Sequence, residues 1–89
     1  MTEKSIHIQN KLGLHARASA KLVSTASRFS SEITLIKDQI EVNGKSIMGI
    51  MMLAACKGTE LCLRAEGKDA EEAVNAIELL VNDRFGEKE

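Results

Sequence analysis

Hydrophobic residues recur at every second position in four short stretches of the chain, and this alternation predicts four β-strands. The stretches are residues 5–9, 32–37, 39–42 and 59–66. In the first stretch Ile6 and Ile8 share one face and His7 lies on the other, so we expect one buried and one exposed face. Only Asp38 separates the second stretch from the third, so these two strands are expected to form a hairpin with a tight turn.

In two other stretches, residues 16–29 and 70–85, the apolar residues recur every three or four positions, which predicts two amphipathic helices. Between them a short helix is predicted over residues 47–56, an apolar run that follows Ser46. The buried stripes are expected to be Ala18, Leu22, Ala26 and Phe29 in the first helix and Ala70, Ala73, Ile77, Leu80 and Val81 in the last. Lys57-Gly58 is a helix-ending signal for the second helix. Asp69 and Glu72 have the spacing of a capping box for the third, with Asp69 as the cap. Gly86 should end that helix and leave residues 87–89 frayed.

The predicted order of elements, β-α-β-β-α-β-α, favours an α+β fold. Amphipathic helices on one face of a mainly antiparallel sheet form an open-faced β-sandwich. The 89 residues suffice for one small domain, spanning residues 1–89. The hydrophobic pattern does not choose between strand orders, and a ferredoxin-like order remains open.

Composition narrows the classes of function. Lys and Arg number 12 and Asp and Glu number 13, so the chain lacks the basic excess of a general nucleic-acid binder. No apolar run has the length of a membrane span, and Met1-Thr2-Glu3-Lys4 is not the start of a signal peptide, so we expect a cytoplasmic protein without membrane insertion. Cys56 and Cys62 are expected to be reduced thiols. His7 and His15 have no zinc-like spacing, so no metal is expected.

The stretch from Lys11 to Ala18, which joins the first strand to the first helix, carries the clearest candidate chemistry. Gly13 supplies a flexible joint, and His15 follows at or beside the helix N-cap, where backbone N–H groups lack partners. Arg17 adds a positive charge, so the imidazole lies beside an anion site. The helix end and Arg17 both disfavour imidazolium, so we expect a neutral His15 that can attack phosphorus. The alternative is a surface histidine that only caps the helix.

A second stretch of interest begins at the Asn43-Gly44 turn. Ser46 is a good N-cap for the short helix that follows, and this helix is hydrophobic nearly all round. Full burial is difficult in so small a domain, and methionines suit an adaptable contact surface. We therefore assign Ile47, Met48 and Met51 to an exposed docking patch and Ile50, Leu53 and Ala54 to the core; the alternative is that all are core. A nucleotide-binding P-loop is rejected, because Gln39 stands where that motif needs its first glycine.

The two motifs together resemble one known family. Gly13-Leu14-His15-Ala16-Arg17 resembles the active-site motif of the HPr family, the histidine-containing phosphocarriers of the bacterial phosphoenolpyruvate-dependent phosphotransferase system. Asn43-Gly44-Lys45-Ser46-Ile47-Met48-Gly49 resembles the regulatory serine site of the same family, and the likeness runs over nearly the whole chain. One departure is Ala18, where many members have proline. Alanine restores an N–H and keeps good helix propensity, so we expect transfer to survive.

The resemblance implies a stoichiometric carrier rather than an enzyme. Phosphorylated enzyme I would be the donor, Nδ1 of His15 the acceptor atom, and proteins of the IIA type the next acceptors. Phosphate would be held by Arg17 and by the backbone N–H groups of Ala16 and Arg17. An ATP-dependent HPr kinase would phosphorylate Ser46. The implied strand order is 1-4-2-3, and we expect a monomer without cofactors.

Two other classes remain as alternatives. An RNA-binding α/β module would need a basic patch, aromatic residues and a clamp loop of the Gly-x-x-Gly type, and the chain has only two aromatic residues, both Phe. A free-standing enzyme is disfavoured because one histidine and one arginine stand without a second domain to form a pocket.

Overall fold

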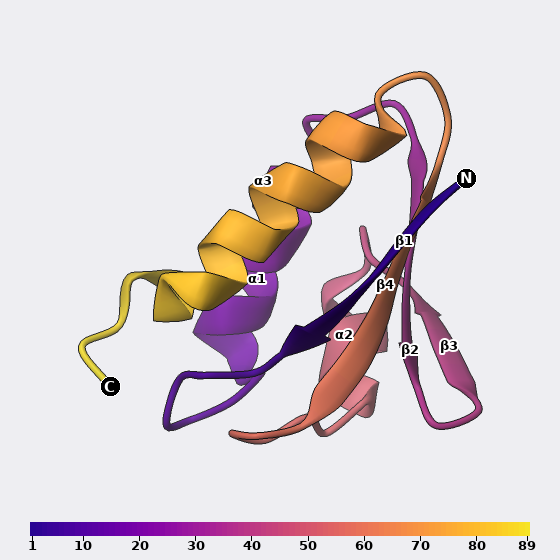
Figure 1. Cartoon of the computed structure of the whole chain (residues 1–89). Coiled ribbons are helices and arrows are strands. Elements are labelled where there is room, and N and C mark those ends of the chain that lie inside the picture. Colours follow the sequence, from indigo (N-terminus) through magenta and orange to yellow (C-terminus); the bar gives the residue numbers. More distant parts are fainter.

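A four-stranded antiparallel sheet forms one layer of the molecule and three helices pack on one of its faces (Figure 1). The computed structural model describes residues 1–89. Its elements are β1 (Thr2–His7), α1 (Ala16–Ala26), β2 (Glu32–Lys37), β3 (Ile40–Asn43), α2 (Ile47–Met52), β4 (Glu60–Glu66), α3 (Ala70–Asn82) and a 3₁₀ turn (Arg84–Gly86). The seven helices and strands predicted from the pattern are therefore all present.

The sheet has the strand order β1-β4-β2-β3, with every neighbouring pair antiparallel. This is the order that the resemblance implied and that the hydrophobic pattern left open. The register pairs apolar residues on the helix side of the sheet, as with Ile6 opposite Leu61 and Leu35 opposite Leu63. A slip of one residue would turn these side chains to the open face, so their burial fixes the register.

One hydrophobic core lies between the two layers. It contains residues from the strands, the three helices and the segments between them: Ile6, Ile8, Leu14, Ala18, Leu22, Ala26, Ile33, Leu35, Ile50, Leu53, Ala55, Leu61, Leu63, Ala65, Ala70, Ala73, Val74, Ile77, Val81 and Phe85. Two residues of the predicted stripes, Phe29 and Leu80, are only partly buried at its edge. The core thus reaches from β1 to the residues that follow α3.

All three predicted helices end earlier than expected, the third at Asn82 rather than at residue 85. The first ends at Ala26 rather than at residue 29. The second ends at Met52, and Ala54 adopts a left-handed backbone conformation (φ +49°) that a helix cannot contain. The expectation that Ala54 belongs to the core is wrong: Ala54 is exposed, and the turn buries Ala55 instead. Lys57-Gly58 belongs to the turn before β4, where the N–H of Gly58 donates to the carbonyl of Ile8.

The predicted capping box at the start of α3 is also wrong. Asp69 is the N-cap residue, but its side chain makes no capping hydrogen bond. Its carboxylate instead accepts hydrogen bonds from the backbone N–H groups of Ser30 (2.9 Å) and Ser31 (3.0 Å) and from the hydroxyl of Ser31. The hydrogen bonds from the Ser31 hydroxyl and the Ser30 backbone lower the pKa of Asp69 to about 2. Asp69 therefore ties α3 to the loop before β2.

The third helix ends at Asn82, and the chain then folds Phe85 back into the core. Arg84 and Phe85 both have φ near +55°, so the right-handed helix stops. This conformation costs about 1–2 kcal/mol per residue, whereas burial of a phenylalanine side chain contributes about 1.5–3 kcal/mol. Because the two amounts nearly balance, the contacts made by the residues after Phe85 matter for holding the segment in place.

Candidate functional site

The loop between β1 and α1 is held in place by backbone contacts. Gly13 has φ +68°, and a Cβ atom there would lie 2.5 Å from the carbonyl oxygen of Ala55 and 2.8 Å from Cα of Cys56. The next N–H, of Leu14, donates to that same Ala55 oxygen (2.9 Å). Only glycine suits both the conformation and the close approach at position 13. The loop therefore delivers the next residue, His15, in a defined position.

His15 is the N-cap residue of α1. Its backbone is extended (φ −76°, ψ −179°), and its side chain makes no capping hydrogen bond. The interpretation of His15 as a plain capping side chain therefore does not fit. The first-turn N–H groups of Ala16 and Arg17 have no acceptors within the helix, and the imidazole itself is half-buried.

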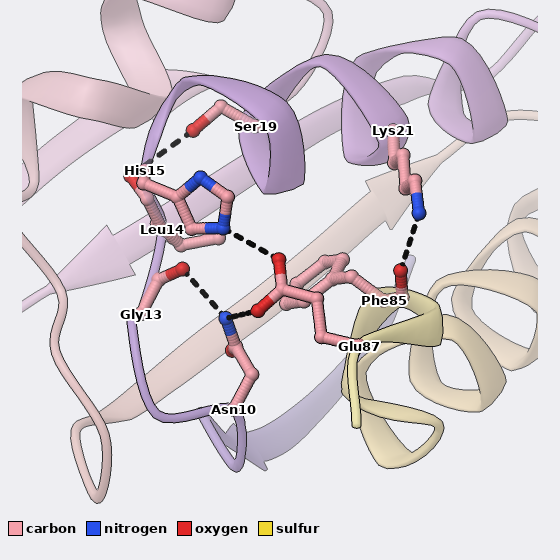
Figure 2. A network of polar contacts seen from close by, with 8 residues as sticks. All are labelled: Asn10, Gly13, Leu14, His15, Ser19, Lys21, Phe85 and Glu87. Atoms are coloured by element: carbon pink, nitrogen blue, oxygen red, sulfur yellow. Dashed lines mark hydrogen bonds and ion pairs between the residues drawn. The ribbon is translucent and has the colours of Figure 1, made fainter. Parts of the chain in front are cut away.

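The imidazole is bound by a residue that lies 72 positions further along the chain. Nε2 of His15 lies 2.5 Å from Oε2 of Glu87, and Figure 2 shows the two side chains pointing toward each other. The other oxygen of Glu87 accepts from Nδ2 of Asn10 (3.0 Å), which also donates to the carbonyl of Gly13 (2.8 Å). Asn10, itself a residue of this loop, is fully buried. The site is thus assembled from the loop, the helix end and the C-terminal segment.

The expectation that residues 87–89 fray is wrong. Phe85 is buried, its carbonyl accepts from Nζ of Lys21 (2.7 Å), and the backbone oxygen of Glu89 accepts from the N–H of Lys11 (2.5 Å). Figure 1 shows this segment, in yellow, returning toward the loop after β1. The sequence carries one indication that this segment is ordered: Phe85, a large aromatic residue, lies beyond the end of α3 and is followed by Gly86 and Glu87. Asn10 gave no comparable signal.

Glu87 is ionised in neutral solution. Burial acts to raise its pKa, but the hydrogen bonds from Asn10 and His15, together with the charge of Arg17 and that of His15 when its ring is protonated, hold the pKa below its ordinary value. A carboxylate accepts hydrogen bonds only, so Nε2 of His15 must be the donor. In a neutral ring the other nitrogen, Nδ1, then carries the lone pair. Nδ1 has no hydrogen-bond partner, and Figure 2 shows no dashed line to it.

Arg17 lies exposed in the first turn of α1, close enough for its charge to act on Glu87. With residues of the loop and the C-terminal segment it lines a hollow of about 490 Å³, formed by Lys11, Leu12, Arg17, Glu87, Lys88 and Glu89. The hollow thus contains lysine and arginine side chains together with Glu87, the residue that contacts His15. Glu87 places a negative charge beside the ring that reasoning from the sequence did not include, and the neutral state of His15 stays a prediction.

Ser46 caps α2 as expected. Its Oγ accepts from the N–H of Gly49 (3.1 Å), and the preceding Lys45 donates from Nζ to the carbonyl of Phe29 (2.7 Å). The side chain of Ser46 is half-buried. Ser46 therefore closes the first turn of its own helix.

The helix that Ser46 caps divides its apolar residues between core and surface. Ile50 and the following Leu53 are buried, as expected. Ile47, Met48 and Met51 are 41%, 78% and 43% exposed, so the alternative that all of them are core is wrong. Met52, which the sequence did not single out, is 74% exposed. An apolar surface thus lies on α2, which packs against α1.

Comparison with known proteins gives the family. The family model PTS-HPr, described as the PTS HPr component phosphorylation site, matches residues 2–83. The chain belongs to the HPr family.

Similarity to members of the HPr family extends over the whole chain. The phosphocarrier protein HPr of Neisseria meningitidis is 56% identical over 89 residues, which is 100% of both chains. The crystal structure of HPr-C-His from Thermoanaerobacter tengcongensis has a TM-score of 0.96 at 52% identity and covers 100% of both chains. A crystal structure of an HPr dimer from the same organism has a TM-score of 0.79 at 53% identity, covering 98% of this chain and 100% of that one. The monomeric state expected here stays a prediction.

Ala18, the departure from the HPr pattern, is fully buried in the first turn of α1. The first intrahelical bond of α1 is donated by Ser19 to the carbonyl of His15 (2.8 Å). The N–H of residue 18 therefore has no acceptor within the helix, and proline or alanine can occupy the position without loss of a helical bond.

No helix of the structure combines the length and the apolar character needed to cross a bilayer.

Proposed function

We propose that this chain carries a phosphoryl group on Nδ1 of His15, receives it from phosphorylated enzyme I and passes it to acceptors of the IIA type. The observation that carries the proposal is that only one of the two ring nitrogens of His15 has a hydrogen-bond partner. Nε2 is bound by Glu87, while Nδ1 has no partner and belongs to a residue at the N-terminus of α1. The names of the curated relatives, which are phosphocarrier proteins, support the same function.

The transfer is a displacement at phosphorus. The lone pair of Nδ1 forms the new N–P bond while the bond between phosphorus and the donor breaks, and the proton on Nε2 stays in place. The first-turn N–H groups of Ala16 and Arg17 and the guanidinium of Arg17 stabilise the charge on the phosphoryl oxygens. Arg17 is exposed, so water and salt screen its charge and the bound phosphoryl group can leave again. A carrier needs both properties.

Incubation with enzyme I and labelled phosphoenolpyruvate tests this function. We expect one acid-labile phosphate per chain in the wild-type protein and none in His15→Ala. The matched control is His7→Ala, because His7 is exposed on β1 and is the only other histidine. Incorporation of phosphate at the wild-type level in His15→Ala would contradict the proposal.

The exposed residues of α2 are proposed as the docking surface for donor and acceptors. Ile47, Met48 and Met51 form an apolar patch on a helix that packs against α1, the helix that begins beside His15. Flexible methionine side chains can fit several partners, which a carrier with a different donor and acceptor requires.

Regulation by an HPr kinase at Ser46 is the remaining part of the proposal. The match of Asn43-Gly44-Lys45-Ser46-Ile47-Met48-Gly49 to the family's serine site supports it. The side chain of Ser46 directly precedes Ile47 and Met48, so a phosphate on Oγ would bring negative charge to the apolar patch. Incubation with ATP and an HPr kinase, with Ser46→Ala as the negative control, tests this part separately from transfer to His15.

A further inference from the structure

Glu87 is held in place by more than its bond to His15. Its other carboxylate oxygen accepts from Asn10, a fully buried residue of the loop (Figure 2). On one side of Glu87, Phe85 is anchored in the core, and on the other the backbone oxygen of Glu89 accepts from Lys11. The side chain of Glu87 is only 14% exposed. The carboxylate is therefore fixed against the ring by contacts that do not depend on His15.

Phosphoryl transfer at Nδ1 changes the charge of the ring, and the contact between Glu87 and Nε2 acts on that charge. When Nδ1 forms a bond to phosphorus while Nε2 keeps its proton, the ring gains a positive charge, and that charge grows as the N–P bond forms. A carboxylate at 2.5 Å from Nε2 in a largely buried site attracts this charge more strongly than a carboxylate in water would. The proton on Nε2 then also assists the onward step, because the ring leaves phosphorus as neutral imidazole rather than as an anion.

We propose that Glu87 is a positioning residue for phosphoryl transfer: it holds the neutral ring of His15 in the Nε2–H tautomer and keeps that proton on Nε2 once Nδ1 carries the phosphoryl group. The inference rests on the proposed function. It assigns to the C-terminal segment a role in the reaction, beyond packing against the core.

No other charged group near the site takes the place of the Glu87 carboxylate at Nε2 of His15. Arg17, from α1, opposes a positive charge on the ring. Lys11 from the loop and Lys88 from the C-terminal segment add positive charge to the same hollow. Glu89 is the only other carboxylate there, and it lies exposed beside Nζ of Lys11 (3.7 Å). Glu87 is thus the one anion in contact with Nε2, and Glu89 offers a matched control.

The first experiment uses the unphosphorylated protein. Nitrogen-15 NMR of the neutral His15 ring distinguishes the Nε2–H from the Nδ1–H tautomer. We expect the Nε2–H tautomer in the wild type and in Glu89→Ala, and a mixture containing Nδ1–H in Glu87→Ala. An unfolding midpoint for each variant shows whether the fold is kept. A single Nε2–H tautomer in a folded Glu87→Ala would overturn the tautomer role.

The second experiment uses the phosphorylated protein and the isosteric variant Glu87→Gln, which keeps the shape and removes the charge. The pH at which the phosphorylated ring loses its Nε2 proton should fall by about one unit or more, as expected on loss of an adjacent opposite charge. Transfer to a IIA-type acceptor should slow about tenfold above that pH, which corresponds to about 1.4 kcal/mol. Glu89→Gln should match the wild type in both measurements.

The outcomes separate this inference from the proposed function. If the wild type takes up phosphate on His15 and Glu87→Gln behaves like Glu89→Gln, then Glu87 only anchors the C-terminal segment and the inference is overturned. If the wild type takes up no phosphate from enzyme I, the proposed function fails and the transfer role of Glu87 fails with it. In that case the tautomer measurement on the free protein still decides whether Glu87 orients the ring.

Discussion

The N-termini of α1 and α2 are built alike but use their capping residues in opposite ways. His15 and Ser46 both have extended backbones at the N-cap. Ser46 turns its side chain inward and accepts the N–H of Gly49. His15 turns its side chain away from the helix and toward Glu87. The N-terminus of α2 is completed by its own capping side chain, whereas the N-terminus of α1 has no such cap.

The difference follows from what each helix needs for stability. α2 has only six residues, which is too short to be stable without a cap and tertiary contacts. α1 has eleven residues, three of which, Ala18, Leu22 and Ala26, form a buried apolar stripe, so packing can replace the missing cap. A helix can therefore do without a capping side chain at its N-terminus where burial stabilises it. The orientation of the His15 side chain must then come from elsewhere, here from residues 85–89.

The strongest prediction concerns the loop that brings His15 to the start of α1. Gly13→Ala should destabilise the protein by about 2–5 kcal/mol, combining left-handed strain with a clash against the backbone at Ala55. Gly58→Ala is the control, because Gly58 also has positive φ but a Cβ there meets nothing within 4 Å. Denaturant midpoints measure both variants. Equal losses in the two would mean that the close approach at Gly13 is unimportant.

The next prediction concerns the surface that follows Ser46. Met48→Asp should weaken binding to enzyme I and to a IIA-type acceptor at least about tenfold, because a charge would have to be desolvated in an apolar contact. Leu79→Asp is the control, since Leu79 is similarly exposed (70%) but lies on α3. Titration calorimetry with each partner gives the affinities. Unchanged affinity in Met48→Asp would move the docking surface away from α2.

Arg17→Ala should act on the other helix start, and mainly on rate. A buried charge-assisted hydrogen bond to phosphate contributes about 1.5–3 kcal/mol. Because Arg17 is exposed, its contribution should be smaller, so we expect transfer to slow about tenfold. The unfolding midpoint should change little. Raising the salt concentration should shrink the difference between variant and wild type. An unchanged rate at low salt would remove Arg17 from the phosphate site.

The sequence alone predicted most of the fold that positions the two helix N-termini. Alternation and helical periodicity identified the four strands and the two longer helices, because burial of one face governs both patterns. The position of His15 at the helix N-cap and the capping role of Ser46 were also accessible, since both depend on local chemistry. The boundaries of α1 and α2 were not, because Phe29 and Ala54 continue the apolar pattern after the backbone has left the helix.

The rest of the site depends on contacts between distant residues. Asn10 and Glu87 are separated by 77 positions, and both look like ordinary polar surface residues in the sequence. Asp69 has the spacing of a capping box, yet its carboxylate binds Ser30 and Ser31, whose N–H groups only the folded chain brings near. Local pattern gives no information about such pairings.

Removing the two caps should have different costs. Ser46→Ala should lower the free energy of unfolding by about 1 kcal/mol, the usual loss of a serine N-cap. His15→Ala should cost less through capping, because the side chain of His15 accepts no hydrogen bond from α1. Urea denaturation of both variants makes the comparison, with Ser24→Ala, an exposed position within α1, as the reference, where the higher helix propensity of alanine should slightly stabilise the protein. A change in stability for Ser46→Ala no more unfavourable than that for Ser24→Ala would contradict the capping role.

The smallest effect on stability, and the one that links both helix ends, is expected from phosphorylation of Ser46. A phosphoserine adds about −1.5 to −2 charges at the N-terminus of α2. That charge should stabilise the helix by about 0.3–1 kcal/mol at an exposed end, which for a domain of this size raises Tm by a few degrees at most. The same charge adjoins Ile47 and Met48, so it should slow phosphorylation of His15 by enzyme I. A melting curve and the rate of phosphate uptake, measured on phosphorylated and unphosphorylated protein, test the two effects. A lower Tm would refute the helix-end argument, and an unchanged rate would show that the patch on α2 lies outside the contact with enzyme I.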